Sequence, residues 1–101
     1  MNKYELVYII APDVDEEGRK ALRERVNDLI VRDGGEVIKV EDWGKRRLAY
    51  DIKKESEGFY VLFYVTCEPA CVAEVDRVMK ITDEILKHMI VRSDEKGAAN
   101  E

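Results

Sequence analysis

The stretch Gly58-Phe59-Tyr60-Val61-Leu62-Phe63-Tyr64-Val65 is apolar or aromatic at both sets of alternating positions. A strand of this composition belongs in the middle of a sheet, because both of its faces are suited to burial. Residues 4–10, Tyr-Glu-Leu-Val-Tyr-Ile-Ile, are also rich in β-branched and aromatic side chains, and they stop at Ala11-Pro12. We therefore expect two central strands.

One helix is predicted between these strands and another after them. The first begins with a capping box in which Asp13 is the N-cap and Glu16 reaches back, and Gly34-Gly35 ends it through a left-handed residue. Its buried stripe is Leu22, Val26, Leu29 and Ile30, and its solvent side holds Arg19, Lys20, Arg23, Glu24 and Asp28. The second helix starts near Pro69, whose missing N–H costs nothing in the first turn. It buries Val72, Val75, Val78 and Met79.

Two further strands complete the pattern. Residues 36–52 have β-type composition, with a bulge or bend at Gly44. Residues 54–58 have the composition of a turn, so residues 36–52 are expected to pair with the third strand as a hairpin. Residues 85–91 are expected to form a fourth strand. This order predicts an α+β fold, a ferredoxin-like split βαβ sandwich with a four-stranded antiparallel sheet in the order 4-1-3-2 and two helices on one face. We expect one domain over residues 1–93 and a short flexible tail over residues 94–101.

Positive charge is concentrated in the segment from Glu41 to Lys54. This segment holds five of the 17 Lys and Arg but only three carboxylates, so it carries +2 while the rest of the chain carries −7. A formal net charge of −5 and a pI near 5.0 argue against nucleic-acid binding through overall charge. Any RNA contact is therefore expected to be local. The alternative is a solvated basic edge strand that only prevents edge-to-edge aggregation.

Catalysis and metal binding are disfavoured. The chain has no nucleophile with a histidine partner and no phosphate-cradling glycine loop, and Cys67, Cys71 and His88 are too few for a four-ligand zinc site. We expect these three side chains to be packed, with no cofactor and no small-molecule substrate. The N-terminus lacks the order of a signal peptide, and the apolar run over residues 6–11 is too short to cross a bilayer. A cytoplasmic protein without a membrane partner is expected.

The pattern Gly44-Lys45-Arg46-Arg47-Leu48-Ala49-Tyr50-x-Ile52-Lys53 resembles the signature of the bacterial small-subunit ribosomal protein six family. The resemblance covers residues 1–93, from Tyr4-Glu5 to Met89-Ile90-Val91-Arg92. It implies a structural constituent of the small ribosomal subunit that binds the central domain of small-subunit ribosomal RNA together with the eighteenth small-subunit ribosomal protein. The acidic net charge agrees with this role, because a basic partner can supply phosphate-neutralising residues and be held by the acidic surface.

The alternative function is a stand-alone module, either RNA-recognition-like or a small-ligand regulatory protein. RNA-recognition domains share this element order and stack bases on aromatic side chains of the third strand. Their motif K/R-G-F/Y-G/A-F-V-x-F/Y is only partly matched, because Glu57 replaces the basic residue, Tyr60 the small one and Val61 the central aromatic. The aromatic residues of this strand are therefore expected mainly to fill its two faces.

The residues expected to contact RNA or the partner protein are seven cations and one aromatic side chain: Lys3, Trp43, Lys45, Arg46, Arg47, Lys53, Lys54 and Arg92. Adjacent strand positions point to opposite faces, so Arg46 should reach different groups from Lys45 and Arg47. The same alternation predicts that Leu48, Tyr50 and Ile52 point inward, as in a half-buried strand.

Overall fold

Antiparallel pairing between β1 (Asn2–Ile10) and β3 (Glu55–Cys67) forms the centre of the structure, a computed structural model that describes residues 1–92. β2 (Glu36–Ile52) pairs with β3, and β4 (Ile85–Arg92) pairs with β1. The sheet order β2-β3-β1-β4 is the predicted order in reverse, so the predicted topology is confirmed. The predicted tail over residues 94–101 lies outside the described residues.

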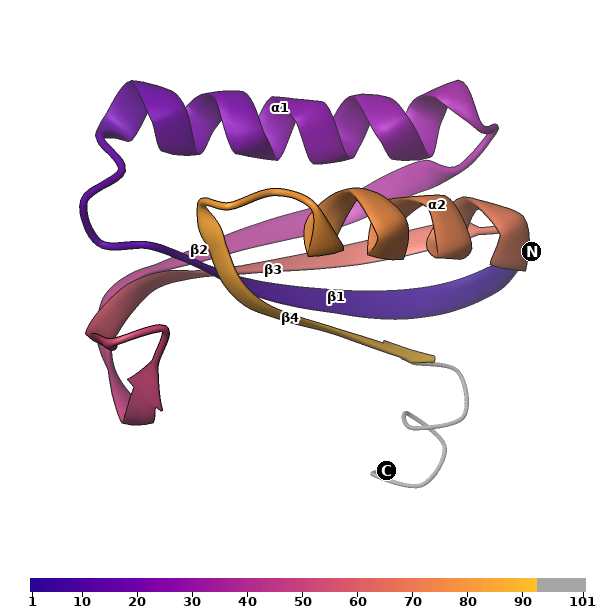
Figure 1. Cartoon of the computed structure of the whole chain (residues 1–101). Coiled ribbons are helices and arrows are strands. Elements are labelled where there is room, and N and C mark those ends of the chain that lie inside the picture. Colours follow the sequence, from indigo (N-terminus) through magenta and orange to yellow (C-terminus); the bar gives the residue numbers. More distant parts are fainter. Residues whose placement is uncertain (93–101) are drawn as a thin grey trace.

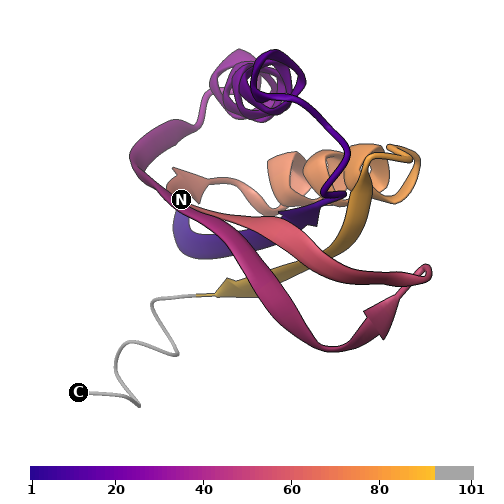
Figure 2. The same ribbon diagram turned by 90° about the vertical axis from the view of Figure 1, so that its left-hand side faces the viewer.

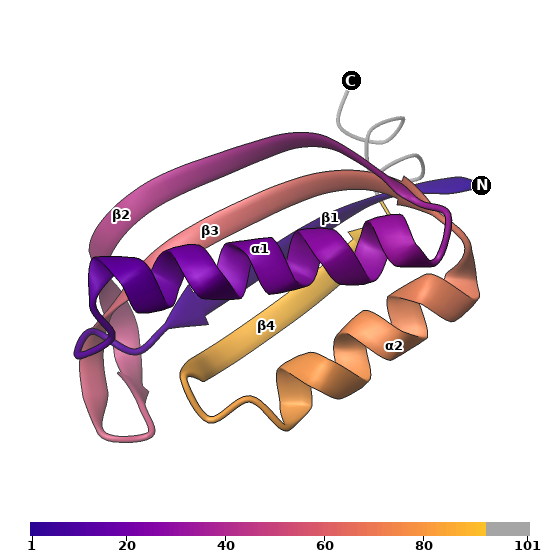
Figure 3. The ribbon, with the colours of Figure 1, turned by 90° about the horizontal axis from the view of Figure 1, so that it is seen from above.

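Both helices lie on one face of the sheet (Figure 1), as predicted, and the view from the helix side shows them next to each other (Figure 3). They are α1 (Glu16–Arg32) and α2 (Pro69–Lys80). The main core lies between the two helices and one face of the sheet. Alternate residues of the two central strands point into it. Its most buried members are Leu6, Tyr8, Ile10, Val26, Ile30, Val61, Phe63, Val65, Cys67, Cys71, Val75, Met79 and Ile85.

The N-cap of α1 differs from the prediction. Asp15, and not Asp13, has the extended N-cap conformation, and its Oδ1 accepts a hydrogen bond of 2.8 Å from the backbone N–H of Gly18. The helix therefore begins at Glu16, two residues later than a cap at Asp13 would place it. The prediction took the first aspartate of Asp13-Val14-Asp15-Glu16, whereas the second one caps the helix.

The C-terminus of α1 follows the predicted glycine signal. Gly34 has φ +84°, its N–H donates to the carbonyl of Val31, and the N–H of Gly35 donates to the carbonyl of Ile30. These two bonds form a Schellman motif that satisfies carbonyls left open at the helix end. The motif turns the chain directly into β2.

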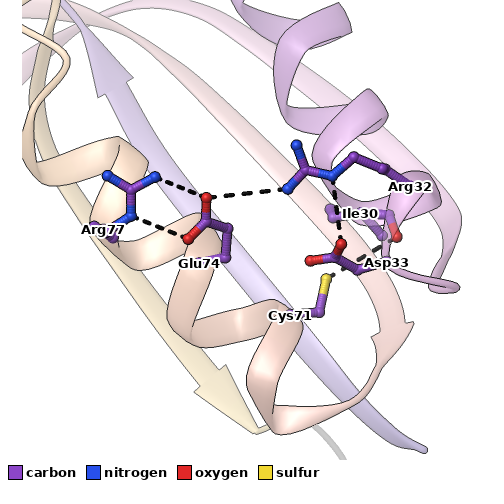
Figure 4. Close-up of polar contacts among 6 residues, drawn as sticks. All are labelled: Ile30, Arg32, Asp33, Cys71, Glu74 and Arg77. Atoms are coloured by element: carbon purple, nitrogen blue, oxygen red, sulfur yellow. Dashed lines mark hydrogen bonds and ion pairs between the residues drawn. The ribbon is translucent and has the colours of Figure 1, made fainter.

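Polar contacts connect the end of α1 with α2 (Figure 4). Glu74 accepts two hydrogen bonds from Arg77 at 2.8 and 3.0 Å and lies 4.0 Å from the guanidinium of Arg32. Below this exposed network, the thiol of Cys71 lies 4.0 Å from the carbonyl oxygen of Ile30. Exposed ion pairs contribute little to stability, so the buried apolar contacts hold the two helices together.

The β2–β3 hairpin turns at Lys53 and Lys54, which have φ values of 51° and 68°. This corrects the prediction of a turn over residues 54–58, because β3 already begins at Glu55. Two successive positive φ angles match a tight hairpin turn with the right-handed twist of its strands. Asn-Gly or Gly-Gly usually marks such a turn, and Lys-Lys gave no such signal.

The tip of this hairpin lies on the side of the sheet away from both helices (Figures 1 and 2). There Leu48 packs with Ile9 and Leu86 in a second small cluster, and Leu48 is 7% exposed as predicted. Tyr50 was expected to point inward but is 62% exposed. The register of β2 against β3 shifts between Arg47 and Ile52, so regular alternation no longer predicts which side chains are buried there.

Gly58 lies where β3 approaches β1 closely. A Cβ at this position would be 2.4 Å from Cγ2 of Ile9 and 3.1 Å from the carbonyl oxygen of Ile10. Both neighbours belong to the central strand, and backbone atoms there cannot move away without breaking sheet pairing. Only glycine therefore fits at position 58 without a steric clash. This position lies beside Ile9 of the second cluster.

We predict that Gly58→Ala lowers the free energy of unfolding by about 1 to 3 kcal/mol, the usual cost of an overpacked core position. Chemical denaturation measures the change. Ser56→Ala on the same strand is the matched control, because Ser56 is exposed and such changes stay within about 0.5 kcal/mol. Equal denaturation midpoints for the Gly58→Ala and Ser56→Ala variants would contradict a close approach of Gly58 to β1.

Leu48→Ala is expected to cost about 2 to 5 kcal/mol, since the truncated side chain leaves a cavity against Ile9 and Leu86. The control is Ile38→Ala on the same strand, where the side chain is 58% exposed and its loss should cost far less. A denaturation midpoint for Leu48→Ala that equals that of the parent would show that the second cluster does not stabilise the fold.

Candidate functional site

The bulge in β2 fixes which basic side chains share a face. The register shifts between Asp42 and Gly44, where Gly44 has φ +77°, so Trp43 and Gly44 together lie opposite Tyr60. After this shift Lys45 lies opposite Phe59 and Arg46 opposite Gly58. As predicted, adjacent cations therefore point to opposite sides of the strand.

Arg46 belongs to an aromatic cluster on the side of the sheet without helices, here called the open face. Its guanidinium lies 5.5 Å from the ring centroid of Trp43 and donates a hydrogen bond to the carbonyl of Trp43 at 3.3 Å. Trp43 in turn stacks on Tyr60 with a centroid distance of 6.4 Å and an interplanar angle of 11°. The indole N–H donates to Glu41 at 2.9 Å, which fixes the orientation of the ring.

Lys45 lies on the opposite side, which faces α1. Its ammonium group is 5.6 Å from the ring centroid of Phe59, and the guanidinium of Arg19 is 3.8 Å from the same centroid. Arg19 was predicted to face solvent, but it is only partly exposed and reaches the sheet. The same correction applies to Arg23, which pairs with Asp42 of β2 at 3.3 Å. Helical periodicity placed both arginines on the polar side and gave no measure of how far their long side chains reach.

The remaining cations of the hairpin are exposed. Arg47 lies opposite Glu57 in the ladder, yet within residues 1–92 no carboxylate is within ion-pair distance of Lys45, Arg46 or Arg47. Lys53 and Lys54 occupy the turn, and the ammonium of Lys53 lies 3.5 Å from the carbonyl oxygen of Ile85. The hairpin therefore presents positive charge that the described part of the chain does not neutralise.

Lys3 and Arg92 do not join this group. Arg92 pairs with Tyr4 at the other end of the sheet, and its guanidinium donates to Asn2 at 3.0 Å. Lys3 is exposed on β1 and borders a largely apolar hollow with Tyr64 and Lys39. The eight predicted residues thus fall into two regions, six on the hairpin and two near the N-terminus of β1.

Sequence reasoning missed several paired groups. Lys39 contacts Glu41 at 2.9 Å, which raises the pKa of the lysine and lowers that of the glutamate. Lys87 donates to the hydroxyl of Tyr50 across the open face at 3.0 Å, a bond that lowers the pKa of the tyrosine. Lys87 and Tyr50 lie on different strands, so only the fold reveals their pairing, whereas alternation along one strand already places Lys39 and Glu41 on the same face.

Three other titratable side chains were expected to be simple packing residues. The imidazole of His88 contacts Asp76 of α2 at 2.7 Å, and this hydrogen bond lowers the pKa of Asp76, as does Lys80. Cys67 and Cys71 are free and buried, and burial raises the pKa of both thiols, that of Cys67 to about 12. A thiol so reluctant to ionise is a poor nucleophile, and the packed role predicted for both cysteines is confirmed.

The geometry favours non-covalent binding. No group of three or more metal-ligating side chains occurs within residues 1–92, and no helix there is long and apolar enough to cross a membrane. The hairpin carries cations without carboxylate partners in the described residues, and two of them, Lys45 and Arg46, lie near aromatic rings on opposite sides of β2. Such groups suit phosphate on one side of the strand and a polar or aromatic protein surface on the other.

Comparison with known proteins gives consistent matches over nearly the whole chain. The family model described as Ribosomal protein S6 matches residues 3–92. The small ribosomal subunit protein bS6 of Exiguobacterium sibiricum is 56% identical over 96 residues, 95% of this chain and 100% of that protein, and that of Desulforamulus reducens is 53% identical over 95 residues, 94% and 100%. The crystal structure of 30S ribosomal protein S6 from Thermotoga maritima superposes with a TM-score of 0.87 at 35% identity, over 99% of this chain and 98% of that one.

Proposed function

The chain belongs to the Ribosomal protein S6 family, and from this premise we propose that it binds the central domain of small-subunit ribosomal RNA together with the eighteenth small-subunit protein, using the basic β2–β3 hairpin. Family membership makes it a structural component of the small ribosomal subunit, located on the ribosome, and not an enzyme. The RNA domain and the protein partner are the proposed part.

The observation that carries the proposal is the unneutralised charge of the hairpin. Elsewhere on this acidic chain many cations have carboxylate partners, such as Arg23 with Asp42, Arg77 with Glu74 and Lys80 with Asp76. Lys45, Arg46 and Arg47 have none within residues 1–92. Cations kept free of carboxylates are available for phosphate oxygens, to which charge-assisted hydrogen bonds are about twice as strong as neutral ones.

The open face supports a protein partner. No helix covers it (Figure 1), and it presents Trp43 stacked on Tyr60. Beside them is a mainly apolar hollow lined by Val7, Ile9, Tyr60, Lys87, His88 and Met89. Aromatic residues, Met and Arg are enriched at the centres of protein interfaces. A basic partner would also be attracted to a chain whose formal net charge is −5.

We predict that the isolated protein binds central-domain RNA weakly and that the eighteenth protein raises its affinity about 5- to 150-fold, the range of an ordinary coupling free energy. The net charge is the reason, because the chain alone repels phosphate outside the hairpin. Filter binding or calorimetry at physiological salt, with and without the partner, measures the effect. Equal affinity of the isolated protein and of the pair would refute partner dependence.

Replacing Lys45, Arg46 and Arg47 together by Gln should weaken incorporation into the subunit and lower the slope of log affinity against log salt by about 0.7 to 0.9 for each lost phosphate contact. Stability should change by no more than about 0.5 kcal/mol per exposed site. The control removes the same formal charge from the helix surface through Arg25→Gln, Arg77→Gln and Lys80→Gln, of which Arg77 and Lys80 are cations with carboxylate partners. If both triple variants behaved alike, only total charge would matter and the hairpin would be a solvated edge.

A further inference from the structure

Two cations from different elements converge on one ring at the base of the hairpin. Arg19 comes from α1 and Lys45 from β2, and their charged groups lie 3.8 and 5.6 Å from the ring centroid of Phe59. Each side chain is drawn to the negative face of the ring. Both groups are positively charged and contact the same ring, so an anion that reached both would offset their mutual repulsion.

The carboxylates near this pair have other partners or lie out of reach. Asp42 accepts from the N–H of Gly44 at 3.0 Å and pairs with Arg23 at 3.3 Å. Asp15 accepts the capping bond from Gly18. Within residues 1–92 neither Arg19 nor Lys45 has a carboxylate within ion-pair distance, and Arg47 beside them has none either.

Arg19 is also held in place before any ligand binds. One of its terminal nitrogens donates to the carbonyl of Val14 at 2.8 Å, and its planar group rests on Phe59. A guanidinium has five N–H donors, so most of them stay available. Fixing the side chain in advance lowers the entropy that binding would otherwise cost.

We propose that Arg19 and Lys45 form a composite site for the phosphate backbone of RNA, with Phe59 as the platform that holds both cations. The inference rests on the proposed function and assigns the two faces of β2: the side toward α1 contacts RNA, and the open face, where Arg46 is engaged with Trp43, contacts the protein partner. The ring of Phe59 is occupied by cations, so it holds the groups that bind phosphate and does not stack on a base. Contacts of this kind position the RNA without reading its sequence.

The test measures RNA affinity against salt for the complex with the eighteenth protein, using Arg19→Gln and Lys45→Gln singly and together. Each single change should weaken binding to a similar degree for different RNA sequences and lower the salt slope by about 0.7 to 0.9, and the double variant should lower it by about twice as much. Affinity for the protein partner should not change. Lys45→Arg, which keeps the charge, should restore the slope.

Two controls separate this site from general charge and from folding. Arg25→Gln removes one exposed cation from α1 on the side toward α2, and Arg46→Gln removes one from the open face. Arg25→Gln should leave both affinities unchanged, and Arg46→Gln should weaken only the partner contact. Thermal melting of every variant tests for loss of fold, which would not by itself alter the salt slope of the folded fraction.

Three results would overturn the inference. An unchanged slope for both Arg19→Gln and Lys45→Gln, beside a lowered slope for the triple hairpin variant, would reject this site and leave the proposed function standing. Loss of partner affinity in place of RNA affinity would assign the site to protein. No RNA binding by the unmodified pair would reject the proposed function and the inference together.

Discussion

The close contact of β3 with β1 at Gly58 is the constraint on which the rest of the structure depends. It lies directly next to the ladder in which all of β1 pairs with β3, from Asn2 opposite Cys67 to Ile10 opposite Phe59. One face of this pair then receives the helices, and the other receives the hairpin tip through Leu48. A fold of this size has only a small margin of stability, so crowding at one central position affects both cores.

Much of the fold could be predicted because the spacing of apolar residues and the residues that end helices and strands indicated the same elements. Apolar strands over residues 4–10 and 58–65, the stripe on each helix and the glycine pair after α1 all point to the same topology. The errors occurred where a short-range signal was ambiguous or absent. Two acidic residues competed for the cap of α1, and the hairpin turned at Lys53 and Lys54 without glycine.

The candidate site was predicted only in part. The basic stretch of β2 stands out because the rest of the chain is acidic, and alternation correctly separated Arg46 from Lys45. The position of Arg19 was not predictable, since its contact with the ring of Phe59 joins residues 40 positions apart and depends on how α1 lies on the sheet. Long side chains on a polar helix face look alike in sequence, and tertiary packing decides which of them reach the sheet.

Gly44 has a consequence for how the two sides of β2 are distinguished. In a regular strand Trp43 and Arg46 would point in opposite directions, because they are three positions apart. They share a face because the bulge places one extra residue opposite Tyr60. If the strand kept all its residues but lost the bulge, Lys45 would move to the open face, Arg46 would turn toward α1, and Leu48 would leave its cluster. A residue without a charge or a side chain thus determines which of the neighbouring cations lies on each side of β2.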